Sequence, residues 1–284
     1  ELVTSTLGPD RLLFTGEYPV FDPGLLVPWV RYADIPEPAA RRIAGDNLRG
    51  LLDAVVRGAA TEGAAAAQPV PEPASPRATA AGAPIAPRDP IHAALLAGRP
   101  LDWLPVVDLH GHFGEGSVAS ARPQRDPDMM VREMDLYGVD VVVCSAIATG
   151  AAGSLERAND QVLAAARAAP GRILGYCVLS ANRPERNLDE LRRCWELGLR
   201  CGVKMHRYNQ PEYSVTDRFL EPVLEFLDQH RLIYLNHELG TEAQIEAVAR
   251  RYPGVTFING HGGIAPARLG GRLGNVYANS CSMM

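Results

Sequence analysis

Short apolar segments alternate with amphipathic segments along most of the chain. Beyond residue 100, seven apolar runs have the length of strands, at residues 106–112, 139–146, 173–180, 199–206, 232–239, 255–263 and 275–282. Between them, apolar residues recur every three or four positions, which predicts helices at residues 126–138, 154–171, 187–198, 217–230 and 241–253. Ser154 is a suitable N-cap, and a short helix or turn follows the sixth strand. This alternation predicts a parallel sheet of βα units.

The N-terminal part adds an eighth unit. Residues 11–20 predict a strand that runs into a loop, residues 36–56 predict a helix, and residues 1–8 suggest the end of another helix. Eight such units predict an α/β protein with a (β/α)8 TIM barrel, whose usual length of about 250 residues suits this chain. The alternative is an open doubly wound sheet. That fold usually carries a G-x-G-x-x-G turn after its first strand, and GHFGEG lacks this spacing.

Residues 58–90 differ in composition from the rest of the chain. Of these 33 residues, 12 are Ala, 7 are Pro and none is aromatic. Such a segment buries too little apolar surface to offset the entropy of ordering it, which indicates a linker. We therefore expect the eighth unit at residues 1–57, a connecting region at 58–100, and units one to seven at 101–284.

The eighth unit comes first in this chain, so the barrel is expected in permuted order. Residues 11–20 should pair between the strands at 106–112 and 275–282. A circular permutation would give this order, and so would a segment taken from two barrels in tandem. The chain begins at Glu1 without an initiator Met and stops after a seventh strand, which favours the tandem arrangement.

The amino-acid composition and net charge limit the kinds of molecule that this protein is expected to bind. The chain is 46% hydrophobic and 21% charged, which excludes wholesale disorder. A net charge of -5 argues against nucleic acid or an anionic membrane as the main partner. No apolar run is long enough to cross a bilayer. The five Cys show no metal-finger or disulfide spacing. We expect a cytoplasmic protein with a small-molecule substrate, and a homodimer is compatible with the sequence.

Histidines mark the ends of the predicted strands. His110 and His112 end the first strand two positions apart, so both imidazoles face one side and together are suited to a divalent ion. Asp108 shares their register and is expected to orient them, not to bind the ion. Five of the seven His lie at such ends, where barrel enzymes build their active sites. The other strand-end candidates are His206, with Lys204 on the same face, His237 and His261.

Two loops add further candidates. Glu17 ends the strand of the eighth unit and is either an anionic metal ligand and proton acceptor or a solvated loop carboxylate. Arg207, Tyr208 and Asn209 follow the fourth strand in a loop suited to a polar or anionic substrate. The alternative for this loop is an ordinary solvated turn, which we prefer.

Taken in order, the strand-end motifs resemble those of the amidohydrolase superfamily, in the amidohydrolase-related branch that includes the aminocarboxymuconate-semialdehyde decarboxylase type. The motifs are DLHGH, GVKMH, NHELG, NGHGG and RLLFTGEYP. The resemblance implies that His110, His112 and His237 bind metal, and that His261 binds a second metal or acts as an acid/base. It also implies a metal-bridging role for Lys204 if that residue is carboxylated; otherwise Lys204 and His206 can contact the substrate. Arg207 and Tyr208 are substrate-binding candidates only from the residue types of their loop.

The resemblance implies a metal-dependent hydrolase. A divalent ion, Zn²⁺ before Mn²⁺ or Fe²⁺, would activate water against an amide, ester or lactone carbonyl. Glu17 and His261 would be its catalytic residues. Glu17 departs from the pattern, because the superfamily usually has Asp there. The alternatives are a metal-dependent non-oxidative decarboxylase of an unsaturated or aromatic acid, or a catalytically impaired fragment.

Overall fold

The computed structural model describes residues 9–14, 35–60, 93–94, 97, 99, 105–114, 126–146, 154–207 and 211–279. Among these, no helix is long and apolar enough to span a membrane. The predicted helix end at residues 1–8, Glu17, Tyr208 and most of the predicted linker lie outside the described residues.

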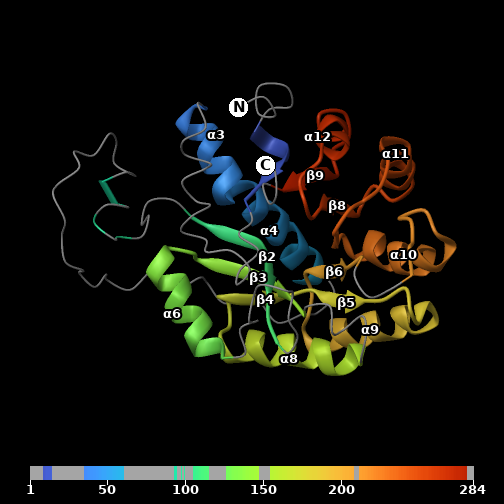
Figure 1. Ribbon diagram of the computed structural model, residues 1–284, viewed down its shortest axis with the longest axis horizontal. Coiled ribbons are helices and arrows are strands. Elements are labelled where there is room, and N and C mark those ends of the chain that lie inside the picture. The colour runs from blue at the N-terminus through green and yellow to red at the C-terminus, as the bar shows by residue number, and fades with distance from the viewer. Residues whose placement is uncertain are drawn as a thin grey trace.

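All strand pairs in the described part of the chain are parallel (Figure 1). One sheet has the order β1-β9-β8-β7-β6-β5 and the other β2-β3-β4. Only Tyr176 separates β4 from β5, so the chain passes directly from the three-stranded sheet into the six-stranded sheet at this point. The strands are β1 (Leu12–Leu13), β2 (Val107–His112), β3 (Val141–Ser145), β4 (Ile173–Gly175), β5 (Cys177–Leu179), β6 (Gly202–Met205), β7 (Ile233–Asn236), β8 (Thr256–Asn259) and β9 (Val276–Asn279).

Helices follow the strands as the sequence predicts, and most of them lie around the outside of the strands (Figure 1). They are α3 (Glu37–Arg41), the π-helical turn η2 (Arg42–Asp46), α4 (Asn47–Ala60), α6 (Pro127–Tyr137), α8 (Leu155–Ala168), α9 (Asn187–Leu197), α10 (Glu221–His230), α11 (Glu242–Arg251) and α12 (Ile264–Gly270). Short 3-10 turns are η1 (Pro9–Arg11), η3 (Pro184–Arg186) and η4 (Arg218–Leu220).

Local sequence explains where the helices begin. Ser154 caps α8 as predicted, because its side chain accepts a hydrogen bond from Arg157 N. Thr241 and Gln244 form a reciprocal capping box at the start of α11. These caps satisfy backbone donors that a helix start leaves without partners. They therefore stabilise the two connections that lead into α8 and α11.

The described residues confirm the α/β class and the predicted strand positions, with two differences. The predicted strand at 173–180 is divided into β4 and β5, and of the predicted strand at 11–20 the structure describes residues 11–14, among which Leu12–Leu13 form β1. On one side β1 pairs with β9 as expected, through Leu12–Ala278 and Leu13–Asn279. Between β1 and β2 the described residues form no ladder, so a closed barrel in permuted order stays a prediction. The helix α4 also extends to Ala60, three residues into the predicted linker.

Two layers of apolar residues hold the fold together. A large cluster joins the outer sides of the strands to the helices, with Val142, Val162 and Leu224 among its members. A second cluster joins strands to one another and to α4, and it includes Leu13 of β1, Leu48 of α4 and Leu109 of β2. The two ends of the strand order therefore contribute to one core, although no ladder joins them.

Candidate metal centre

The strand-end side chains gather at one end of the sheets. His110 and His112 belong to β2 and Lys204 belongs to β6, while His206, His237 and His261 follow β6, β7 and β8. Because all strand pairs are parallel, these carboxyl ends lie on the same side of the molecule. Lys204 is fully buried, four of the histidines are buried, and His261 is half-buried.

The five imidazoles form a closed ring, here called the histidine ring, made of His110, His112, His206, His237 and His261. Ring centroids lie 5.2 Å apart between His110 and His112 and 5.6 Å apart between His112 and His206. The ring continues from His206 to His237 at 5.4 Å and from His237 to His261 at 3.7 Å, and it returns to His110 at 5.4 Å. The structure thus brings together all five strand-end histidines, which are far apart in sequence.

Lys204 extends into the histidine ring. Its Nζ lies 2.5 Å from His110 Nε2. It is the only Lys among the 28 basic residues of the chain, and the others are all Arg. A compact amine therefore occupies the most enclosed cationic position, where a planar guanidinium would need more room.

Polar neighbours orient two of the imidazoles. His110 Nδ1 lies 3.2 Å from the Gly260 carbonyl oxygen, and His112 Nδ1 lies 3.3 Å from Ser145 Oγ. Both rings can therefore keep Nε2 as the nitrogen that meets a metal ion. Partners of this kind on the second ring nitrogen are typical of metal-binding histidines. The donor set fits a divalent transition metal in this respect.

Asp108 lies beside an irregularity in the pairing of β2 with β3. The pairing of β2 with β3 is irregular between Asp108 and Gly111, so the simple two-residue alternation of side chains is broken there. Asp108 Oδ1 instead accepts a hydrogen bond from the backbone N of His110, at 2.9 Å. The carboxylate therefore stabilises the irregular backbone that presents His110.

Burial keeps three of the five imidazoles neutral. Desolvation, and after it the charge of Lys204, lowers the pKa of His110 and of His206 well below the usual value. Desolvation and the neighbouring His261 lower the pKa of His237 to about 2. Neutral imidazole is the form that binds a metal ion.

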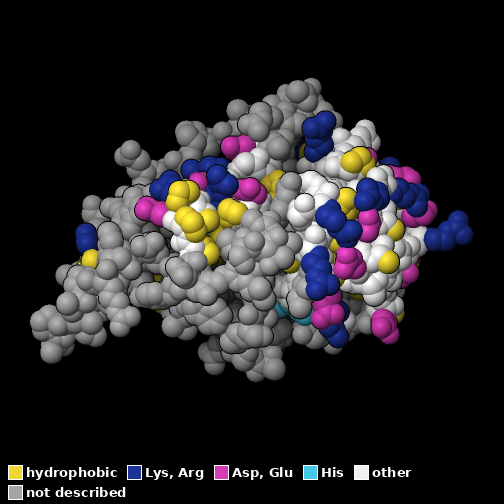
Figure 2. All heavy atoms as spheres, turned by 90° about the horizontal axis from the view of Figure 1, so that it is seen from above, with side chains coloured by type: hydrophobic (Ala, Val, Ile, Leu, Met, Phe, Trp, Pro, Cys, Tyr) yellow, Lys and Arg dark blue, Asp and Glu magenta, His cyan; other side chains and the backbone are white. Residues whose placement is uncertain are grey.

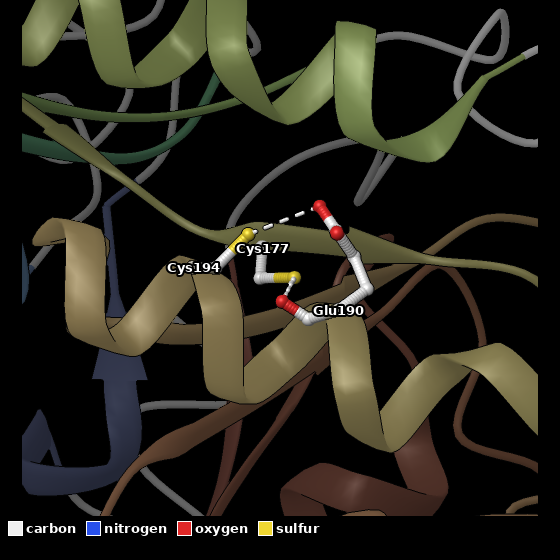
Figure 3. Close-up of side chains that lie close together, drawn as sticks. All are labelled: Cys177, Glu190 and Cys194. Carbon is white, nitrogen blue, oxygen red and sulfur yellow. Dashed lines mark hydrogen bonds between the residues drawn. The ribbon is translucent and has the colours of Figure 1, made fainter.

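The nitrogen atoms of the histidine ring are too far apart to bind one ion together without a movement of side chains. Among the described residues, the set of three ligand atoms that lie within 4.8 Å of one another comes from Cys177, Glu190 and Cys194 (Figure 3). An ion on His110 Nε2 would need the space that Lys204 Nζ takes. The predicted ligand roles of His110, His112 and His237 therefore require Lys204 to move or to become a ligand itself.

The Cys177–Glu190–Cys194 group is a structural network. Arg193 donates to both carboxylate oxygens of Glu190 at 2.8 Å, and Asn159 Nδ2 donates to Oε1 at 2.8 Å. The Cys194 thiol lies 3.3 Å from the same oxygen, and burial raises the pKa of the Cys177 thiol well above its usual value. The Glu190 charge is already matched, and a protonated thiol is a poor ligand, so this group joins α8, β5 and α9 without a metal.

A cavity of about 800 Å³ opens beside the histidine ring at His261. Its described lining includes Glu212, Tyr213, Asp217 and Glu238, and it includes no Lys or Arg. Arg207 is exposed and pairs with Glu238. In Figure 2 a small area of His colour lies beside acidic and basic side chains.

Sequence reasoning missed two residues that contact the histidine ring. Ser145 ends β3 and Asn279 ends β9, and both are fully buried. Their signal is the one that identified the histidines, namely a polar side chain at the carboxyl end of a buried strand. Both are uncharged, so nothing about them alone indicates chemistry.

Three solved structures similar to this chain are a TIM-barrel protein from Bordetella bronchiseptica, 2,6-dihydroxybenzoate decarboxylase from Rhizobium, and 5-carboxyvanillate decarboxylase from Novosphingobium aromaticivorans solved with manganese. Their identities to this chain are 20%, 17% and 16%, with TM-scores of 0.42, 0.44 and 0.41. The matches cover 53%, 54% and 55% of this chain and 58%, 65% and 58% of those proteins. This chain therefore spans about two thirds of their length or less.

No curated protein matches the sequence significantly. The model of the amidohydrolase family matches residues 107–282, which run from β2 past β9 and contain the whole histidine ring. More than half of the chain is covered, and the chain belongs to the amidohydrolase family.

Proposed function

We propose that this chain carries the active site of a metal-dependent enzyme for small molecules. His110, His112 and His237 would hold a divalent ion, with Glu17 as a further ligand from outside the described residues. The neutral imidazoles of His110 and His237 support this, as do the outer partners on Nδ1 of His110 and His112, which direct Nε2 to the ion once Lys204 has moved. The bound ion would supply Lewis-acid polarisation of a substrate oxygen. Zn²⁺ and Mn²⁺ are the two ions to test first.

The reaction that the described geometry favours is decarboxylation of a small carboxylic acid. The observation that carries this proposal is the buried Lys204 Nζ at the histidine ring: moved away from His110 Nε2 by the ion, it would donate to a substrate carboxylate away from solvent. The bond from the substrate carbon to the carboxylate breaks, CO₂ leaves, and the electron pair stays on the carbon. His261 lines the cavity and would deliver the proton that this carbon takes up.

Hydrolysis is the second candidate, and the cavity lining favours it. Glu212, Asp217 and Glu238 line the cavity, and no described Lys or Arg does, which disfavours an anionic substrate at that surface. Hydrolysis also needs a group that accepts a proton from water. Glu17 would take that role, as the sequence suggests.

Assays of the metal-loaded protein separate the two reactions. The protein is loaded with Mn²⁺ or Zn²⁺ and incubated with 2,6-dihydroxybenzoate or 5-carboxyvanillate, and CO₂ release is measured. In parallel, p-nitrophenyl acetate and a γ-lactone report hydrolysis. We expect CO₂ release from an acid of this class. Hydrolysis without CO₂ release would support the second candidate, and neither activity on a broad panel would contradict both.

A variant tests the role of Lys204. Lys204→Met keeps the length of the side chain and removes its donor, so we expect decarboxylation to fall about 10- to 100-fold, the worth of a hydrogen bond to a charged group. Arg200→Met is the control, because the Arg200 guanidinium stacks on Trp195 instead of joining the histidine ring. Equal rates in the two variants would contradict the assignment.

A further inference from the structure

The side chain of Asn279 hydrogen-bonds to the loop that follows β8. It is the last residue of β9 and is fully buried. Its Oδ1 accepts a hydrogen bond from Gly262 N at 3.2 Å, and its Nδ2 donates to the Gly260 carbonyl oxygen. One side chain thus holds this loop at two points, immediately before and after His261.

The same carbonyl meets His110. Gly260 O lies 3.2 Å from His110 Nδ1, and Asn279 Nδ2 lies 3.4 Å from that nitrogen. A carbonyl oxygen can only accept, so this contact is a hydrogen bond only when Nδ1 carries the proton. On the opposite edge of the ring, Nε2 faces the Lys204 amine. The contacts with Gly260 and Lys204 are both satisfied by one tautomer, with Nδ1–H and a lone pair on Nε2, in which Asn279 Nδ2 donates to Gly260 O and not to His110.

The backbone at Gly260 comes unusually close to this ring. A Cβ built at Gly260 would lie 2.8 Å from Asn236 O and 3.2 Å from His110 Cε1. Glycine therefore allows the carbonyl to reach the imidazole, and Asn279 fixes the direction in which that carbonyl points.

We propose that Asn279 is a positioning residue, which holds His110 in the Nδ1–H tautomer by fixing the Gly260 carbonyl. Without Asn279, this carbonyl can turn away and His110 can adopt the Nε2–H tautomer, which has no lone pair for an ion on the ring side. The effect on metal binding rests on the proposed function, whereas the tautomer is a property of the protein alone.

The tautomer and the metal affinity are measured separately. In protein labelled with ¹⁵N-histidine, the imidazole nitrogens report the tautomer, and loss of signals in His110→Gln assigns His110. We expect the Nδ1–H form in the wild type and a mixture in Asn279→Ala. Affinity for Zn²⁺ and for Mn²⁺, measured by competition with a chelator, should fall about 10- to 100-fold, the usual effect of losing an outer partner.

Asn275 provides a matched control at the other end of the same strand. Its Nδ2 donates to the carbonyl oxygens of Ala249, Tyr252 and Val255 at 3.0, 3.2 and 3.0 Å. Asn275→Ala therefore also removes an amide that binds backbone carbonyls, but away from the histidine ring. We expect it to lower stability and to leave the His110 tautomer and metal affinity unchanged.

Several results would overturn the proposal. One is a wild-type His110 in the Nε2–H form, which needs no variant. Another is a folded Asn279→Ala protein with an unchanged tautomer and unchanged affinity. If that variant does not fold, Asn279→Leu keeps a branched side chain of similar length, lacks both polar contacts to the loop, and should shift the tautomer in the same way. A wild type that binds neither ion would contradict the proposed function, and the tautomer would still test the role of Asn279.

Discussion

Replacing Asn159 with Ala should be among the most destabilising changes in the described part of the chain. Asn159 is fully buried between α8, β5 and α9. Its Oδ1 accepts from Val178 N at 2.7 Å, and its Nδ2 donates to Val178 O at 3.1 Å and to Glu190 Oε1 at 2.8 Å. Two neutral hydrogen bonds worth about 1 kcal/mol each and one to a charged group worth about 1.5–3 kcal/mol predict a loss of about 3–5 kcal/mol.

Urea unfolding followed by circular dichroism measures this loss. Asn182→Ala is the control, because Asn182 is exposed and such a change should shift stability by about 0.5 kcal/mol or less. Metal content should be the same in both variants, because Arg193 already pairs with the Glu190 carboxylate. A loss below about 1 kcal/mol for Asn159→Ala would mean that the network around Glu190 is not what joins these elements.

Three further changes test other parts of the account. Glu17→Gln should keep the fold and the ion, which His110, His112 and His237 would still hold, but lower the rate about 10²- to 10⁴-fold if Glu17 transfers a proton; a solvated loop carboxylate would give an unchanged rate in steady-state kinetics. The metal-free protein should lose stability as pH falls below about 6.5, because the buried imidazoles of His110 and His206 have lowered pKa values and the unfolded chain takes up protons first; urea midpoints that stay flat from pH 7 to pH 5 would contradict this. Gly260→Ala should lower both thermal stability and metal affinity, because the added methyl group would clash with Asn236 O and the His110 ring. Unfolding temperatures from calorimetry and affinities from chelator competition that match the wild type would contradict this, because the loop would then accommodate the methyl group without loss.

The sequence predicted the parts of the fold that depend on regular periodicity. Buried parallel strands appear as continuous apolar runs, and the amphipathic segments between them form the helices. The same regularity placed His110, His206, His237 and His261 at strand ends, and this was enough to foresee that they would meet. Their metal-binding roles remain predictions.

The parts that were missed depend on irregular geometry or on contacts between distant segments. The irregular pairing at Asp108 could not be foreseen, because the two-residue period assumes an unbroken ladder. Asn279 and Ser145 act through atoms of other strands, which periodicity does not reveal. The network of Asn159, Glu190 and Arg193 likewise exists only once two helices and a strand have packed.

The metal content of the purified protein tests the central claim most directly. After loading with Mn²⁺ or Zn²⁺ and removal of free ions, elemental analysis of the wild type should give about one to two ions per chain, the range for a site of one or two divalent ions. The double variant His110→Ala/His112→Ala should lose most of this metal, while Cys177→Ser/Cys194→Ser should keep it. An unchanged metal content in the histidine variant, or its loss in the cysteine variant, would contradict the assignment of the histidine ring as the metal centre.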